Sequence, residues 1–97
     1  MAGRYEWDEK KKAANLAKHG LLFEFADRIF ADPELIIVDA SRQEDGEMRQ
    51  KALGRVDGDL YVAVYTQRGL ITRLISVRRM NPNEEKTYGD RQIHARP

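Results

Sequence analysis

Two glycine-containing turns divide the middle of the sequence into strands. The pair Asp57-Gly58 separates an alternating segment, Met48 to Val56, from the largely apolar run Leu60 to Gln67, and Arg68-Gly69 separates that run from Leu70 to Arg79. An Asp-Gly pair between such runs favours a tight hairpin, because the turn needs positive φ angles that these residues tolerate. The pattern therefore predicts an antiparallel meander of three strands at the centre of the fold.

Helix signals lie on both sides of this meander. Asp8 is a good N-cap for a first helix, Gly20 is suited to end it, and a second helix is expected over about Phe23 to Phe30. After the meander, the stretch Asn81-Pro82-Asn83-Glu84 predicts a capped helix start, with asparagine at the N-cap and proline at the first helical position. We expect that helix to stop at Gly89.

Together these signals predict an α+β fold in a single domain. The short β-branched run Leu35 to Val38 can add a fourth strand. The expected order is two N-terminal helices, an antiparallel sheet of three to four strands and a C-terminal helix, with the helices on one face of the sheet. We assign residues 1–97 to one domain, in which about residues 89–97 form a loose tail.

The composition limits the cellular compartments in which the chain is expected and the kinds of site that it can form. The chain has no cysteine, which excludes disulfides and thiolate zinc sites. Its start, MAGRYEWDEKKK, lacks the apolar region of a secretory signal, and no apolar run is long enough to span a membrane. We therefore expect a cytoplasmic protein without a membrane partner.

The first helix carries apolar and basic residues on different sides. Ala13, Leu16 and Ala17 form its apolar side, with Ala14 as a further candidate. Lys10, Lys11 and Lys18 occupy the opposite side, where the simplest interpretation is a solvated face. The pattern therefore predicts that the alanine and leucine side packs on the sheet.

The formal charge of +1 hides an uneven distribution of basic residues. Between Met48 and Met80 there are seven basic and two acidic residues, a balance of +5, whereas the rest of the chain sums to −4. A local basic field on a nearly neutral domain attracts anionic partners. The basic residues of this segment are Arg49, Lys51, Arg55, Arg68, Arg73, Arg78 and Arg79.

The last strand concentrates arginine. Period-two alternation places Arg73 and Arg79 on one face of the segment Leu70 to Arg79 and Arg78 on the other. A guanidinium is permanently charged and can bind a phosphate through two parallel hydrogen bonds. We therefore expect the strand arginines to converge on one phosphate-sized spot.

Three further residues are candidates for proton transfer. His19 closes the first helix, where a charged histidine is also stabilised by the helix dipole, so a structural role is the alternative. Glu85 and Tyr88 are three residues apart on one side of the last helix and can face the strand end. Tyr88 can instead anchor the core, with its hydroxyl at the rim.

Several chemistries lack the residues that they need. The sequence has no CxxC, no histidine pair at ligand spacing and no glycine-rich nucleotide loop, so we expect neither a metal site nor a cofactor. What remains is RNA cleavage through the substrate's own 2′-hydroxyl, for which the protein orients the backbone, stabilises charge and moves protons. The candidate catalytic residues are Arg49, Arg68, Arg73, Arg79, His19, Glu85 and Tyr88, and the candidate RNA-binding residues are Lys51, Arg55 and Arg78.

Three segments of the chain resemble the BrnT family of toxins from type II toxin–antitoxin modules. They are YEWDEKKKAANLAKHGLLFEFADRIF, VYTQRG and RLISVRRMNPNEEKTY, and together they extend over about residues 5–88. The family pattern contains K-x-x-x-N-x-x-K-H-G near the start, Y-T-x-R in the centre and R-I-I-S-A-R-R-A near the end. The chain departs from it at Leu22, Val77 and Met80, none of which changes a charged position.

The resemblance implies a RelE-like α+β fold and a metal-independent endoribonuclease that stops translation. It also implies a cognate antitoxin of the ribbon–helix–helix type (BrnA-like). The complex of the two is expected to repress its own operon, so that operator DNA is contacted only through the complex.

Two other interpretations of the arginines stay open. A non-catalytic module would use the same face to bind RNA or an acidic partner segment, with salt-sensitive binding and no cleavage. A purely structural network would instead pair the arginines with Asp39, Asp57 or Asp59.

Overall fold

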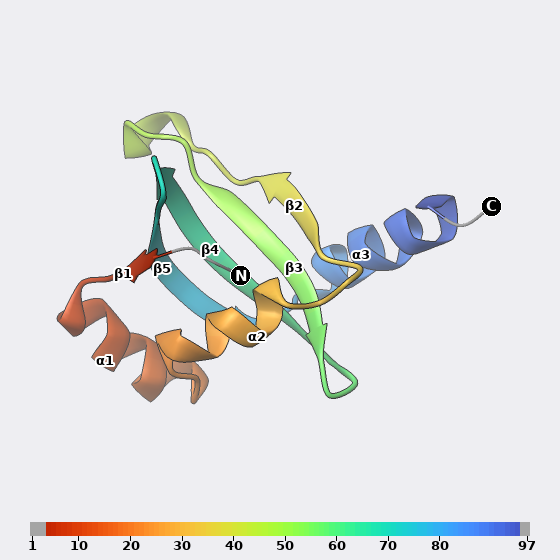
Figure 1. Cartoon of the computed structure of the whole chain (residues 1–97), viewed down its shortest axis with the longest axis horizontal. Coiled ribbons are helices and arrows are strands. Elements are labelled where there is room, and N and C mark those ends of the chain that lie inside the picture. The colour runs from red at the N-terminus through yellow and green to blue at the C-terminus, as the bar shows by residue number, and fades with distance from the viewer. Residues whose placement is uncertain (1–3, 96–97) are drawn as a thin grey trace.

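The computed structural model describes residues 4–95, which form a curved sheet flanked by helices (Figure 1). The helices are α1 (Glu9–His19), α2 (Ala26–Phe30) and α3 (Pro82–Ala95), with short 3₁₀ helices η1 (Phe23–Phe25) and η2 (Gln43–Asp45). The strands are β1 (Arg4–Glu6), β2 (Ile36–Asp39), β3 (Gln50–Val56), β4 (Asp59–Arg68) and β5 (Ile71–Arg79). The predicted α+β class is confirmed. No helix within residues 4–95 is long and apolar enough to cross a membrane.

The sheet has five strands in the order β1-β5-β4-β3-β2. Strands β2 to β5 pair antiparallel, as predicted for the meander and its fourth strand. The β3–β4 turn has positive φ angles at Asp57 (51°) and Gly58 (87°), which a tight hairpin of this type requires. Strand β1 adds a parallel edge next to β5. The sequence did not predict it, because a strand of three residues is too short to show alternation.

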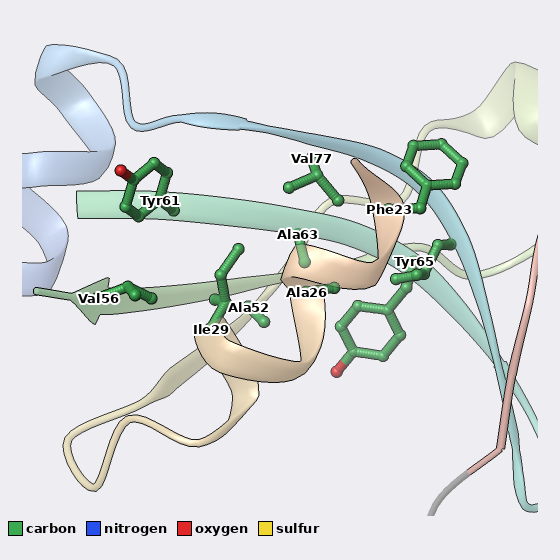
Figure 2. Packing of buried hydrophobic residues seen from close by; sticks show 10 residues of the cluster. Phe23, Ala26, Ile29, Ala52, Val56, Tyr61, Ala63, Tyr65 and Val77 are labelled. Carbon is green, nitrogen blue, oxygen red and sulfur yellow. The ribbon is translucent and has the colours of Figure 1, made fainter. Parts of the chain in front are cut away.

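One face of the sheet packs against η1 and α2 (Figure 2). Phe23, Ala26 and Ile29 are fully buried there, over small residues of β3 and β4. Gly54 lets α2 lie close to β3, because a Cβ at this position would be 2.7 Å from the carbonyl oxygen of Ile29. This close approach forms the larger of the two apolar cores.

The opposite face packs against α3, so the prediction that all helices share one face was wrong. Tyr88 is 1% exposed and packs with Leu53 and Val62, which point away from α2. Strands β3 and β4 carry buried apolar side chains on both faces, since Leu53 alternates with Ala52 in β3 and Val62 with Ala63 in β4. A sheet of this kind needs cover on each face.

The capped start of α3 is confirmed, but its predicted end is not. Glu84 donates its backbone N–H to Asn81 Oδ1 (2.8 Å), and the backbone N–H of Asn81 donates to Glu84 Oε1 (2.9 Å). The helix continues beyond Gly89 to Ala95. Glycine inside a helix costs only about 1 kcal/mol, and the bond from Gln92 Nε2 to the backbone oxygen of Glu34 (2.9 Å) supports the later turns. Of the predicted tail, residues 96–97 lie outside the described range.

Helix α1 begins and ends as predicted but presents an unexpected side to the sheet. Asp8 accepts the first free backbone N–H groups, and Gly20 ends the helix with a φ of 71°. Asn15 is 7% exposed, whereas Leu16 is 44% exposed on the outer side. The side packed against β5 is polar because this edge of β5 offers backbone hydrogen-bonding groups, which an amide can satisfy and an apolar side chain cannot.

Candidate functional site

A bulge in β5 decides which of its side chains share a face. Val64 of β4 pairs with Ser76, but the next residue, Tyr65, pairs with Leu74. Ile75 is therefore an extra residue in β5, and strict alternation is interrupted at that point.

The bulge rearranges the arginines relative to the sequence prediction. Arg73 and Arg78 lie on the same face of the sheet, the face that α3 partly covers. Arg79 pairs with Tyr61 and lies on the other face, with the core below α2. The predicted grouping of Arg73 with Arg79 was wrong, because a period-two pattern cannot include an inserted residue.

Arg78 belongs to a compact group with Lys51 and Glu84, here called the Glu84 cluster. Arg78 Nη1 and Nη2 donate to Glu84 Oε1 (2.7 Å) and Oε2 (2.8 Å), and Lys51 Nζ lies 2.9 Å from Oε2. Glu84 is only 4% exposed, and its Oε1 also accepts the N–H of Asn81. The cluster joins β3, β5 and the start of α3, and its formal charge is positive.

The ionised form of Glu84 is strongly favoured. Burial alone would raise the pKa of its carboxyl group, but the bonds from Arg78, the backbone of Asn81 and Lys51 lower the pKa to about 2. Arg78 also donates Nη1–H to the backbone oxygen of Arg79 (3.1 Å). Of the five N–H donors of a guanidinium, the Nε–H and one Nη2–H of Arg78 have no partner among the described residues. Arg78 is thus fixed in position and retains donors for an external anion.

Two residues before Arg78 in β5, Ser76 lines a surface hollow of about 300 Å³ that opens between α1 and β5. This α1–β5 hollow is lined by Lys11, Asn15, Lys18 and His19 from α1 and by Ile75 and Ser76 from β5. Neither Lys11 nor Lys18 pairs with a carboxylate within residues 4–95. The hollow therefore has cationic walls that are open to an anionic ligand.

His19 is the titratable group of this hollow. Its pKa is lowered from 6.5 by partial burial, by the adjacent charge of Lys18 and by the guanidinium of Arg78. Ser76, which lines the hollow, and Arg78, which belongs to the Glu84 cluster, lie two residues apart on the same face of β5, so the hollow and the cluster are neighbours. A lowered pKa keeps the imidazole neutral near pH 7, so His19 can accept a proton beside this group of cations.

A second charged group lies on the same face at the other end of β5. In this Glu6 cluster, Arg73 Nη1 lies 2.8 Å from Glu6 Oε2, and Arg68 Nη1 lies 3.6 Å from the same oxygen. Arg68 also pairs with Glu47 at 3.2 Å. The formal charges of the two arginines and the two glutamates cancel.

Other candidate residues lie away from both groups. Arg79 pairs with Asp59 at 3.6 Å and lies over the ring of Tyr61, and Arg55 lies over the ring of Tyr88. Tyr88 donates its hydroxyl to Asp32 Oδ2 (2.6 Å), and burial and this bond raise the pKa of the phenol further above its usual value. The position of Tyr88 is that of a core anchor.

The remaining candidate catalytic residues are Glu85 and Arg49. Glu85 is exposed on α3. Arg49 precedes β3 and is half-buried, and its backbone N–H and C=O both bond to the hydroxyl of Ser41.

The prediction that the strand arginines converge on one phosphate-sized spot is therefore wrong. Arg68 and Arg73 join one cluster, Arg78 joins another, and Arg79 lies on the opposite face. Each of the four has a carboxylate partner, as the structural alternative anticipated, although only Arg79 pairs with one of the aspartates considered.

Several residues of the arrangement were missed or undervalued. Glu84 was recognised as a helix cap, but its link to Arg78 and Lys51 depends on the sheet register. For Lys11 and Lys18 the sequence favours a solvated face, whereas in the structure they line the α1–β5 hollow. For Asn15 the sequence does hold a usable signal, because Lys12, Asn15 and His19 follow helical spacing and so place three polar residues on one side of the helix. In the structure Asn15 is buried, and the other two are half-buried.

A comparison with models of known protein families gives a match over most of the chain. The family model described as "Ribonuclease toxin, BrnT, of type II toxin-antitoxin system" matches residues 7–84. That range contains the α1–β5 hollow and both charged clusters except Glu6. No curated protein matches the chain.

Proposed function

Because this chain belongs to the family of BrnT ribonuclease toxins of type II toxin–antitoxin systems, we propose that it is an endoribonuclease that cleaves RNA in the α1–β5 hollow. One observation carries the location: the cations Lys11, Lys18 and Arg78 surround or adjoin a single imidazole, that of His19, whose pKa is lowered. Among the described residues, the α1–β5 hollow is the place where a neutral proton acceptor, His19, lies beside lysines that have no carboxylate partner, Lys11 and Lys18.

The proposed reaction is a transesterification within the RNA. Lys11, Lys18 and the remaining donors of Arg78 hold one phosphate, so that the ribose on its 5′ side lies next to His19. His19 takes the proton of the 2′-hydroxyl, and the 2′-oxygen forms a bond to phosphorus while the bond from phosphorus to the 5′-oxygen breaks. The leaving oxygen takes a proton from solvent. The products are a 2′,3′-cyclic phosphate and a 5′-hydroxyl, and no metal is needed.

The cations have a second role in this scheme. The phosphorane gains negative charge as the new bond forms, and positioned cations that meet this charge lower the barrier. Arg78 suits the task because the Glu84 cluster holds it in place before the substrate arrives. Arg68 and Arg73, on the same face, are proposed to contact flanking phosphates. Arg55, Arg79, Glu85 and Tyr88 are left out of the proposed site.

Membership of the family implies a cognate antitoxin as well as an RNA substrate. We further propose that cleavage takes place in the cytoplasm and stops translation. The antitoxin is proposed to be of the ribbon–helix–helix type and to repress the operon together with the toxin. The support for these points is the sequence resemblance described above.

An RNA cleavage assay that compares matched variants of neighbouring residues tests the proposal. Purified protein is incubated with a structured RNA in excess EDTA, and the fragments are analysed for 2′,3′-cyclic phosphate and 5′-hydroxyl ends. His19→Gln should lower kcat/KM about a hundredfold or more, the usual loss when a general base is removed. Arg78→Lys keeps the positive charge but loses the planar guanidinium that can bind a phosphate through two parallel hydrogen bonds. This variant should lower kcat/KM about a hundredfold. Arg79→Lys, one residue away on the other face, should stay near wild type.

The outcomes separate the proposal from its alternatives. Equal losses of kcat/KM in the Arg78 and Arg79 variants would mean that the reaction takes place outside the α1–β5 hollow. Loss of activity in EDTA would exclude the metal-free reaction. RNA binding that weakens with salt, without fragments at any protein concentration, would favour a non-catalytic module. Expression in a host without antitoxin should arrest growth for the wild type and not for His19→Gln.

A further inference from the structure

Beyond β1, one edge of β5 has no neighbouring strand. β1 pairs only with Ile71 to Arg73, and from there α1 runs along the edge. Val77 directs its backbone N–H and C=O toward this helix, where Asn15 Oδ1 accepts the N–H (3.0 Å) and Asn15 Nδ2 donates to the C=O (2.8 Å). The carboxamide thus bonds to β5 as one residue of a neighbouring strand would.

The same amide makes two further bonds. Nδ2 also donates to the backbone oxygen of Leu21 (3.0 Å), just after the end of α1, and Oδ1 accepts the hydroxyl of Ser76 (3.3 Å). Both donors and both acceptor positions of the side chain are then used. Only a side chain with a donor and an acceptor on one planar group can bond in this way.

We propose that Asn15 is the positioning residue of the ribonuclease site, setting the place of His19 relative to Arg78. Asn15 lies four residues before His19 on the packed side of α1, and it bonds to Val77, the residue that precedes Arg78 in β5. It therefore fixes the end of the helix that carries the base against the strand that carries the guanidinium. This inference rests on the proposed function for its catalytic consequence, but the positioning can be measured without RNA.

The first measurement uses the wild-type protein alone. The amide hydrogen of Val77 should exchange slowly with solvent, since Asn15 protects it where no strand does. The pKa of His19, followed by NMR, should lie below 6.5, because partial burial and the charges of Lys18 in α1 and Arg78 in β5 all lower it. Exchange of the Val77 amide at the rate of an unbonded edge amide would overturn the proposal, whatever the variants do.

The second measurement compares Asn15→Ala with Asn83→Ala, the same change at an exposed position of α3. In Asn15→Ala the His19 pKa should return toward 6.5. The rise of kcat/KM for RNA on the acidic side of its pH profile should shift to higher pH by the same amount. We expect kcat to fall about a hundredfold, the scale of a misplacement of about 1 Å, with KM little changed. If Asn15→Ala does not fold, Asn15→Ser, whose hydroxyl can still accept from Val77, is tested in its place.

A folded variant with the wild-type His19 pKa and wild-type kcat would overturn the positioning role. The two proposals can fail separately. If the wild type cleaves no RNA but the His19 pKa moves in Asn15→Ala, the positioning stands and the proposed function is wrong. If His19→Gln abolishes cleavage and Asn15→Ala changes neither readout, the function stands and this inference is wrong.

Discussion

Replacement of Glu84 by glutamine tests how firmly one carboxylate holds the site together. In the wild type, the pKa of Glu84 is about 2, against 4.5 for an ordinary glutamate. Since each pKa unit corresponds to about 1.4 kcal/mol, the ionised carboxylate contributes about 3 kcal/mol to the free energy of unfolding at neutral pH. Glutamine keeps the shape but brings an NH₂ group toward Arg78 and Lys51. We therefore expect a loss of about 3 kcal/mol, in the range for breaking a buried ion pair.

The pH dependence of that loss gives the sharper test. Because the pKa is lower in the folded state, the contribution is fully present above about pH 4.5 and disappears as the pH falls toward 2. Urea unfolding at pH 7 and pH 3 should show that the difference between wild type and Glu84→Gln falls by about half or more. Glu85→Gln, at the exposed neighbour, should change stability by less than about 0.5 kcal/mol at both pH values. A difference below about 1 kcal/mol at pH 7, or one that is equal at both pH values, would refute the reasoning.

Two other predictions concern the core. Tyr88→Phe removes the hydrogen bond to Asp32 and should lower the free energy of unfolding by about 1.5–3 kcal/mol. The kcat/KM for RNA should stay at the wild-type value. A loss of kcat with unchanged stability would show that Tyr88 takes part in the reaction. Gly54→Ala places a methyl group against the carbonyl oxygen of Ile29 and should destabilise by about 1–3 kcal/mol. Gly89→Ala meets no atom within 4 Å and should raise stability by about 0.5–1 kcal/mol. Thermal or urea unfolding measures all three, and equal effects of the two glycine variants would contradict the packing described for α2.

The features that sequence predicted well are set by neighbouring residues. Asp8 and Gly20 bound α1, the Asp57-Gly58 turn joins β3 to β4, and Asn81 with Glu84 starts α3. In each case a side chain or a glycine satisfies a local backbone requirement, so the signal lies within a few positions of the structure that it specifies.

The features that were missed depend on contacts between distant segments. The extra residue Ile75 is visible only once β4 and β5 are in register, and it changes which arginines share a face. Gly89 looks like a helix end until the contact between Gln92 and Glu34 is known. Asn15 looks out of place on a packed helix face until the unpaired edge of β5 lies beside it.

The same limit applies to the candidate site. The sequence identified His19 and Arg78 among its candidates, but it could not separate them from Arg79 and Tyr88, which lie elsewhere in the fold. Charge density along a strand shows that cations are present. It does not show which carboxylates oppose them, since Glu6 and Glu84 come from other parts of the chain.

The most direct test of the proposed site is the pH dependence of RNA cleavage in the wild type and in Lys18→Gln, with Lys10→Gln as the charge-matched control on the exposed side of α1. If neutral His19 is the base, log kcat/KM should rise with pH and level off above an apparent pKa that lies below 6.5. Removal of the Lys18 charge should raise that apparent pKa toward 6.5, and Lys10→Gln should leave it in place. A wild-type profile that is flat from about pH 5 to 8, across the range in which histidine titrates, or a midpoint that does not change in Lys18→Gln, would contradict the assignment of cleavage to the α1–β5 hollow.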